Sequence, residues 1–524
     1  MNIHKAQPTH RDIAVESSTL IDRRNDTLAL SFGLLAFCLH ALFAARYDLF
    51  RDELYFIVCG RHPAFGYADQ PPLTPLVAAG LYALGKGVWL MRLPVALAAG
   101  ALAWLAVRFA RLLGGGVIAA SGAAICVTIA PLLMGLGATL NTTAFDPLAW
   151  TSIAWCLVYA VKTGRRRTLW LCGLIAGVDL EIKYALVFWG FSLAVGLALT
   201  AERKLLARKD LWIGVALAAI IAGPSLIWQA LHGFPFLELA AAAHNKNADN
   251  APLAFMLNQV LIMNPFLAPV WLSGLIAPFV IERLRPVRFL AISFITCVLL
   301  VILTHGKDYY LAACYPVVFI IGAVAIAHAA RSAAGHAALI GWAIVAVTFS
   351  AWISPLALPI LPVPLLRSYI QRFPFKPQQQ EKIFKGTLLP QVFADQLGWR
   401  DFTSEVGGAW AQIPAAERAR TAIKVDNYGE AAALDVYGVP FRLPPALSGH
   451  NQYFLWGLRG QHPANLLVVQ NHPERLAPYC HQATVLATTS SPDAMAYENG
   501  RVIAYCRGLK VDLATIWPQL KNYN

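Results

Sequence analysis

The stretch LALSFGLLAFCLHALFAA, residues 28–45, is followed after one arginine by YDLFRDELYFIVCGRHPAFGYADQPPLTP, residues 47–75. The first segment is apolar and long enough to be a membrane span. The second contains a dense set of ionisable residues, namely Asp48, Arg51, Asp52, Glu53, Arg61, His62 and Asp69. Only 14% of the chain is charged, so such a cluster at a membrane exit is more than an ordinary loop. We expect a functional site there.

The composition indicates an integral membrane protein. Of the 524 residues, 57% are hydrophobic, and the mean hydropathy is +0.53, whereas globular domains are about 45–50% apolar. The net charge of +13 comes largely from short loops between apolar runs. Membrane topology therefore explains it better than nucleic-acid binding does.

Apolar runs of about 20 residues predict an α-helical polytopic membrane protein with about eleven spans. The predicted spans are 28–46, 88–110, 115–136, 143–161, 168–181, 184–200, 211–230, 254–280, 288–304, 309–330 and 337–356. The N-terminal tail, residues 1–27, has no signal-peptide core before Leu28, so the first span is expected to be an uncleaved signal anchor.

Basic residues predict the orientation of these spans. They gather on alternate loops on the side of the N-terminus, at Arg23–Arg24, Arg108–Arg111, Lys162–Arg167, Arg203–Lys209 and Arg283–Arg288. The positive-inside rule makes that side cytoplasmic. We therefore expect a transmembrane domain over 28–361 in the bacterial inner membrane, with a first outer loop at 47–87. Eleven spans would leave everything after Pro359 outside.

The first outer loop is an exception to this charge rule. It contains Arg46, Arg51, Arg61, Lys86 and Arg92, although outer loops usually have few cations. A phosphate ligand would account for them. Alternatively, they only balance the neighbouring acids.

From residue 362 onward the composition changes to that of an extracytoplasmic α/β domain, 362–524. Strand-length runs at 421–425, 466–469, 483–487 and 502–505 alternate with helix-like stretches at 391–412 and 430–437. Cys480 and Cys506 are the only cysteines of this domain. In an oxidising compartment they are expected to form a disulfide.

Two acids of the first outer loop are candidate catalytic residues. Asp52 and Glu53 are adjacent, so on a helix their side chains diverge by about 100° and cannot act as one pair. Asp69 precedes Pro71 and Pro72, which would present it rigidly toward the same space. The alternative is that Asp69 only caps the following helix.

Polar residues of later loops supply secondary candidates. Asp146 marks the start of the fourth span, while Lys183 and Tyr184 interrupt apolar sequence, where charge is costly and usually functional. His305, Lys307 and Tyr309 belong to the motif THGKDYY. Histidine spacing does not indicate a zinc site. No cofactor is firmly predicted, and a divalent metal remains an open alternative.

Several motifs together resemble a known family. RDELY (51–55), YADQPPL (67–73), IKY (182–184), GKDYYLAACYP (306–316) and NYGEAAALDVYG (427–438) are similar to motifs of bacterial membrane glycosyltransferases. These enzymes form the dolichyl-phosphate-mannose protein mannosyltransferase-like group of the GT-C superfamily, which includes the lipid A aminoarabinose transferases. The resemblance covers nearly the whole chain.

The resemblance implies transfer of a hexose or pentose from a polyprenyl-phosphate donor, with inversion, on the outer membrane face. The acceptor would be a lipid, glycan or protein of the cell envelope. Asp52 matches the catalytic acidic position, Asp69 the acid before the double proline, and Lys183 the donor-phosphate lysine. Gln70 replaces a lysine of the aminoarabinose transferases, and Leu54 and Tyr55 stand where those enzymes have an arginine, which argues against aminoarabinose transfer to lipid A.

The residues themselves favour the same chemistry. A polyprenyl phosphate is a good leaving group, so the protein needs mainly a base for the acceptor hydroxyl and cations for the phosphate. Asp52 would supply the base, and Lys183 with Arg51, Arg61 or Arg92 the cations. The main alternative is a transporter or flippase of a lipid-linked anion, which would place polar residues throughout the spans. A ligand-binding receptor or scaffold would leave the acids of the first loop unexplained.

Overall fold

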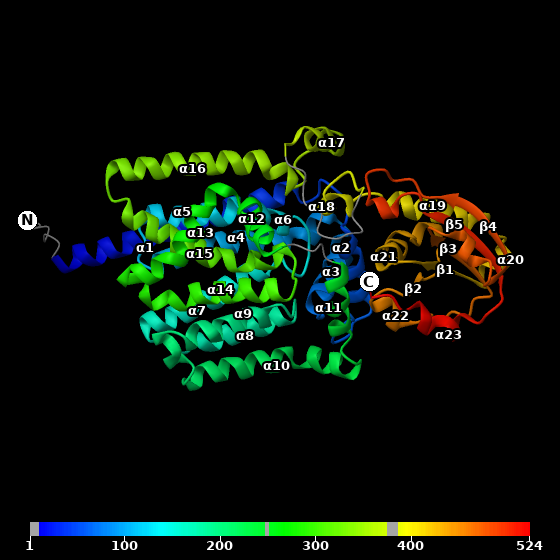
Figure 1. Ribbon diagram of the computed structural model, residues 1–524, viewed down its shortest axis with the longest axis horizontal. Coiled ribbons are helices and arrows are strands. Elements are labelled where there is room, and N and C mark those ends of the chain that lie inside the picture. The colour runs from blue at the N-terminus through cyan, green and yellow to red at the C-terminus, as the bar shows by residue number, and fades with distance from the viewer. Residues whose placement is uncertain (1–9, 247–250, 375–385, 524) are drawn as a thin grey trace, which may run out of the picture.

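The computed structural model describes residues 10–246, 251–374 and 386–523. A long bundle of helices is joined at one end to a compact region that contains a β-sheet, and the start of α1 lies at the other end (Figure 1). We call residues 386–523 the C-terminal region. The bundle begins with α1 (His10–Phe43), which packs along α4 (Val88–Leu112).

Each of the eleven predicted spans contains helix. The remaining bundle helices are α5 (Val117–Ile129), α6 (Pro131–Leu136), α7 (Asp146–Thr163), α8 (Thr168–Leu180), α9 (Leu186–Ala198), α10 (Lys209–Leu231), α12 (Pro252–Ile262), α13 (Ala268–Val280), α14 (Arg288–Leu303), α15 (Tyr315–Ala329) and α16 (Ala333–Ile353).

Length and composition support fewer membrane crossings than the eleven predicted. Within the described residues, six helices are long and apolar enough to cross a membrane, or seven if one bent pair is a single span. Helices α5, α8 and α9 have 13 residues each, about 20 Å at 1.5 Å per residue, less than the roughly 30 Å hydrocarbon core. The count of eleven stays a prediction.

The predicted span 254–280 is not one straight helix. Its two halves meet at a bend of 94°. At the break, the backbone of Asn264 has a positive φ of 72°. The Asn264 side chain accepts a hydrogen bond from the Phe266 amide at 2.9 Å and donates one to Ser350 Oγ at 2.8 Å. These contacts satisfy polar groups that the broken helix leaves open.

The first outer loop folds into two helices, α2 (Arg51–Arg61) and α3 (Leu73–Gly85). They approach so closely that a Cβ atom on Gly60 would lie 2.1 Å from the carbonyl oxygen of Pro75. Only glycine fits at this contact. The close packing fixes the start of α2 relative to the segment that contains Asp69.

The C-terminal region contains a five-stranded mixed sheet in the order β2-β1-β3-β5-β4. Its strands are β1 (Thr421–Val425), β2 (Leu447–Ser448), β3 (Asn465–Gln470), β4 (Cys480–Thr488) and β5 (Val502–Leu509). Strand β1 is parallel to β2 and β3, while β5 is antiparallel to β3 and β4. Its helices include α19 (Trp399–Gln412), α21 (Tyr428–Tyr437) and α22 (Gln452–Trp456).

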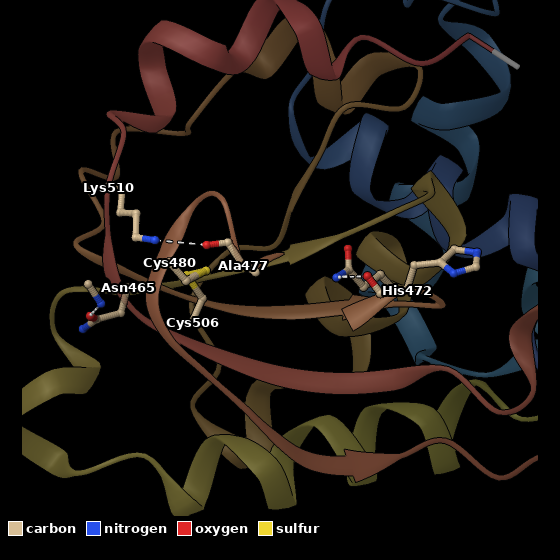
Figure 2. Close-up of a disulfide and its surroundings, with 8 residues drawn as sticks. Asn465, His472, Ala477, Cys480, Cys506 and Lys510 are labelled. Atoms are coloured by element: carbon tan, nitrogen blue, oxygen red, sulfur yellow. Dashed lines mark hydrogen bonds between the residues drawn. A yellow bond between two sulfur atoms is a disulfide. The ribbon is translucent and has the colours of Figure 1, made fainter. Parts of the chain in front are cut away.

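Strands β4 and β5 are joined by a disulfide between Cys480 and Cys506, the predicted pair (Figure 2). Their Cα atoms are 5.4 Å apart, within the usual range. Both cysteines are buried beside Leu466 and Trp517.

The C-terminal region and the first outer loop share one hydrophobic core. It combines buried side chains of α2, such as Leu54 and Ile57, with Phe402, Ile423 and Leu434 of the C-terminal region. Helix α21, which contains the motif NYGEAAALDVYG, packs directly on α2. The two motifs RDELY and NYGEAAALDVYG therefore meet in space.

Candidate active site

Glu53 is a structural residue at the start of α2. Its carboxylate accepts hydrogen bonds from the Phe50 amide at 2.8 Å, from the Leu140 amide at 2.7 Å and from Arg92 at 2.9 and 2.8 Å. Glu53 and Arg92 are both buried. Because its oxygens are already satisfied within the protein, Glu53 helps to cap the helix and leaves Asp52 to point elsewhere.

Arg92 is correspondingly unsuited to the phosphate-binding role that the sequence suggested. Besides Glu53, it donates to the carbonyl oxygens of Ala44 at 2.7 Å and Asp48 at 2.8 Å. All three guanidinium nitrogens thus have protein acceptors, and the side chain is 1% exposed. The positive charge of Arg92, which was counted in the excess of cations in the first outer loop, is thus paired with the buried acid Glu53.

Asp52 faces the C-terminal region. Its Oδ1 accepts a hydrogen bond from the hydroxyl of Tyr428 on α21 at 2.7 Å and lies 3.6 Å from Arg51 Nε. The side chain is 32% exposed. One carboxylate oxygen is therefore oriented by protein, while the group as a whole stays accessible to a substrate.

Arg51 anchors the C-terminal region on α2. Its amide donates to the carbonyl of Asp395 at 2.9 Å, and its guanidinium lies 3.7 Å from the Asp395 carboxylate and 5.1 Å from the ring centre of Tyr428. A Cβ atom on Gly429 would lie 2.5 Å from Arg51 Cγ. The glycine of the NYGE motif thus allows α21 to approach Arg51.

Asp69 is held by partners from two distant parts of the chain. Its Oδ1 accepts a hydrogen bond from Tyr55 at 2.8 Å and its Oδ2 one from Asn451 at 3.0 Å. Loss of hydration raises the pKa of Asp69 from 3.8 to about 6, an effect that the negative charge of Asp52 strengthens and the two hydrogen bonds oppose. Helix α3 begins only at Leu73 with Pro72 as its N-cap, so Asp69 does not cap it.

Residues 450–452, at the start of α22 in the C-terminal region, complete the surroundings of Asp69. The Gln452 side-chain oxygen accepts a hydrogen bond from the Ala68 backbone amide at 2.9 Å. The Gln452 backbone N–H donates to Tyr55 Oη at 3.1 Å. Asn451 adopts φ 49° and ψ −130°, a costly conformation for a residue other than glycine. The sequence contained no signal for this segment, because its contacts join positions more than 380 residues apart.

A second polar group forms around Lys183, in the turn between α8 and α9. Its Nζ donates to Thr143 Oγ1 at 2.6 Å, lies 3.7 Å from Asp146 Oδ2, and is 5.1 Å from the ring centre of Tyr310. The side chain is 20% exposed. The structure thus brings together the motifs at the start of α7, at IKY and at GKDYY.

The two groups are tied together by the backbone. The amide of Leu73, just after the double proline that follows Asp69, donates to the carbonyl of Glu181 at 3.0 Å. Leu73 follows Asp69 closely in the chain, and Glu181 shortly precedes Lys183. This hydrogen bond therefore links the segments that contain Asp69 and Lys183.

The remaining candidates lie in different settings. Tyr184 is buried edge-on against Phe236, with ring centres 4.9 Å apart. His305 is exposed, while Lys307 and Tyr309 are half-buried. Arg61 is exposed at the far end of α2, near the Asp435 carbonyl at 3.4 Å. Since ten helical steps cover about 15 Å, Arg51 and Arg61 do not meet at one phosphate.

Within the described residues, no group of three or more His, Cys, Asp or Glu side chains is arranged to hold a metal ion.

The family model described as dolichyl-phosphate-mannose-protein mannosyltransferase matches residues 69–228, a range that includes Asp69, Asp146 and Lys183. A search of curated proteins gave no match.

Solved structures with a similar fold were found over most of the chain. ArnT from Cupriavidus metallidurans bound to undecaprenyl phosphate superposes with a TM-score of 0.58 at 16% identity, covering 91% of this chain and 97% of that one. Its apo state gives a TM-score of 0.60 at 15% identity, with the same coverage. The chain therefore has the fold of ArnT, and the family model confirms, over residues 69–228, the predicted resemblance to the dolichyl-phosphate-mannose protein mannosyltransferase-like group.

Proposed function

We propose that this chain is a membrane glycosyltransferase that moves a sugar from a polyprenyl-phosphate donor to an acceptor hydroxyl. The observation that carries the proposal is the placement of Asp52 and Asp69 in one site in unlike environments. Asp52 is accessible and oriented by Tyr428, whereas Asp69 is held by Tyr55 and Asn451. Two such carboxylates can divide base and binding roles between them.

In the proposed reaction, Asp52 acts as the general base. The acceptor hydroxyl gives its proton to Asp52 as its oxygen forms a bond to the anomeric carbon of the sugar. The bond from that carbon to the donor phosphate breaks on the opposite side, and its electron pair leaves with the polyprenyl phosphate. The product is therefore inverted at the anomeric carbon. Asp69 shapes the same pocket and accepts hydrogen bonds from sugar or acceptor hydroxyls.

Lys183 is the best placed of the four proposed phosphate ligands. Arg92 forms a buried ion pair with Glu53, and Arg51 contacts Asp395 and Tyr428 of the C-terminal region. Arg61 lies at the far end of α2. Lys183 keeps partial exposure, and its contacts to Thr143 and Asp146 hold the ammonium in place. A charged donor to phosphate stabilises the departing anion. The binding of undecaprenyl phosphate by ArnT supports a donor of this class.

Gln70 adds a neutral donor beside Asp69. Its side chain is 4% exposed, and Nε2 has no hydrogen-bond partner among the described residues. A buried unsatisfied donor is costly, so a phosphate or sugar oxygen of the substrate would stabilise it. The glutamine fits a substrate contact even though it lacks the charge of the lysine in aminoarabinose transferases.

The setting of the reaction follows from the alternation of basic loops. We place the protein as a multi-pass protein in the bacterial inner membrane, with both the first loop and the C-terminal region on the outer face. A reporter that is active only in the cytoplasm, fused after Asn524, should be silent. Activity of that fusion would reverse the orientation.

The function is tested by incubating purified protein with a radiolabelled polyprenyl-phosphate sugar and candidate lipid, glycan and protein acceptors. Acceptor-dependent release of polyprenyl phosphate is expected from the wild type and not from Asp52→Asn. Asp401→Asn, on helix α19, is the matched control, and it should retain activity. Movement of intact donor across vesicles without sugar transfer would instead identify a flippase.

A further inference from the structure

A basic cavity lies at the opposite end of the bundle from the candidate active site. It has a volume of about 400 Å³ and lies between the α4–α5 turn, the segment after α13, and the α15–α16 connection. These elements meet at the end of the bundle that lies away from the sheet (Figure 1). This end carries the basic loops that predict a cytoplasmic orientation, and the proposed glycosyl transfer does not use it.

The charged groups that line the cavity are all of one sign. Its basic side chains are Arg283, His328, Arg331 and His336, and no aspartate or glutamate stands among its lining residues. In the described part of the chain, neither Arg283 nor Arg331 has a carboxylate within 4 Å. The nearby acid Glu282 pairs instead with Arg285 at 3.5 Å. Two permanent positive charges thus face the cavity without a protein anion.

Both arginines are nevertheless held in place by neutral acceptors. Arg283 donates to the carbonyl oxygen of Gly114 at 2.8 Å. A Cβ atom on Gly114, whose φ is 83°, would collide with the guanidinium, so the glycine makes room for it. Arg331 Nε donates to the carbonyl oxygen of His328 at 3.0 Å, and its Nη2 lies 3.2 Å from the His328 ring Nδ1. These contacts orient the guanidinium groups and leave other N–H groups available to a ligand.

The rest of the cavity wall suits a lipid rather than a free ion. Ile118, Ile281, Leu284, Val324 and Ala327 line it beside the basic groups. The first turn of α5, from Val117 to Ala119, also lines it, and backbone N–H groups at a helix start favour anions. An anionic head group next to an apolar wall at a membrane surface is the arrangement of a phospholipid.

We propose that this cavity binds the phosphate head group of an anionic phospholipid of the adjacent leaflet. The phosphate lies between Arg283 and Arg331, and the first part of an acyl chain follows Ile281 and Val324. This site is separate from the donor site and takes a resident membrane lipid as a structural ligand.

The test is native mass spectrometry of the full-length protein released from detergent with phosphatidylglycerol or phosphatidylcholine. Phosphatidylglycerol should remain bound and phosphatidylcholine should not. The double variant Arg283→Gln, Arg331→Gln should weaken phosphatidylglycerol binding by about tenfold or more, because it removes two charged hydrogen-bond donors to the phosphate. The matched control is Arg203→Gln, Lys204→Gln, which removes two charges from another basic loop and should leave binding unchanged.

Other outcomes overturn the proposal. Equal loss in the control pair would mean that binding follows overall charge rather than this cavity. Displacement of phosphatidylglycerol by millimolar inorganic phosphate would identify a site for free phosphate instead of a lipid. Arg283→Lys with Arg331→Lys keeps the charge and guards against misfolding, and it should restore most of the binding. Failure of this variant to bind, while it elutes as a normal monodisperse protein, would exclude a simple electrostatic lipid site.

Discussion

The side-chain amide of Asn451 lies 3.0 Å from Oδ2 of Asp69, although the two residues are 382 positions apart in the chain. One belongs to the C-terminal region and the other to the first outer loop. Tyr428 and Asp52 repeat this relationship at 2.7 Å. Both candidate catalytic acids are thus oriented by residues of the C-terminal region.

Asp52→Asn should reduce turnover by about 10²–10⁴-fold, because it removes the proposed base and keeps the size of the side chain. Tyr428 can still donate to the amide oxygen, so the variant should insert and fold normally. Single-turnover rates with saturating donor measure the chemical step. Normal turnover in this variant together with an inactive Asp69→Asn would exchange the roles of the two acids.

Asn451→Gly should move the acid limb of the pH profile of kcat/KM to higher pH. The lost hydrogen bond favours the charged form of Asp69, so its removal raises the pKa above its value of about 6. The groups around Asp69 that stay unchanged are Asp52, Tyr55 and Cys59 on α2, and Tyr523.

Glycine accepts the positive φ at position 451, so this substitution isolates the side chain. Arg442→Gly is the matched control, because Arg442 is exposed and also has a positive φ of 53°. Its pH profile should coincide with that of the wild type. An unshifted acid limb in Asn451→Gly would show that Asp69 does not control activity through its ionisation.

Lys183→Met should raise the KM for donor by roughly 10–100-fold, since a charged hydrogen bond to phosphate is worth about 1.5–3 kcal/mol. The substitution also leaves buried Asp146 without its cation. The double variant Lys183→Met, Asp146→Asn corrects that effect and should keep the high KM. Recovery of the normal KM in the double variant would show that Lys183 neutralises Asp146 and does not bind the donor phosphate.

Glu53→Gln should lower the stability of the protein rather than its chemistry. It leaves Arg92 as an unpaired buried cation, and breaking a buried ion pair costs about 3–5 kcal/mol. The thermal unfolding midpoint should fall, while kcat of the folded fraction stays near normal. Replacement of both residues, by Glu53→Gln and Arg92→Met, should recover part of the midpoint. A stable but inactive Glu53→Gln protein would place Glu53 in the reaction.

Local sequence predicted much of this structure, because the forces involved are local. Apolar runs gave helix in each predicted span, and the segment 421–425 coincides with β1. Because Asp52 and Glu53 are adjacent on a helix, their side chains were expected to diverge, and they contact different partners in the structure. The bend at Asn264 was missed because hydropathy does not register a single residue with positive φ.

The site itself was only partly predictable. The number of charges marked the first loop as a candidate site. It also suggested Arg92 as a phosphate ligand, because a count of charges does not reveal which acid each cation contacts. The contacts of Asn451 and Gln452 with the loop depend on how α21 and the sheet pack on α2. No local pattern encodes that packing.

The shared hydrophobic core of the first outer loop and the C-terminal region has a consequence for biosynthesis. Ribosomes make the loop with Asp52 and Asp69 well before the residues that orient these acids. Until Tyr428 and Asn451 emerge, the apolar face of α2 has no covering surface and the acids lack their partners. Assembly of the candidate site therefore depends on residues that are synthesised long after the two acids themselves.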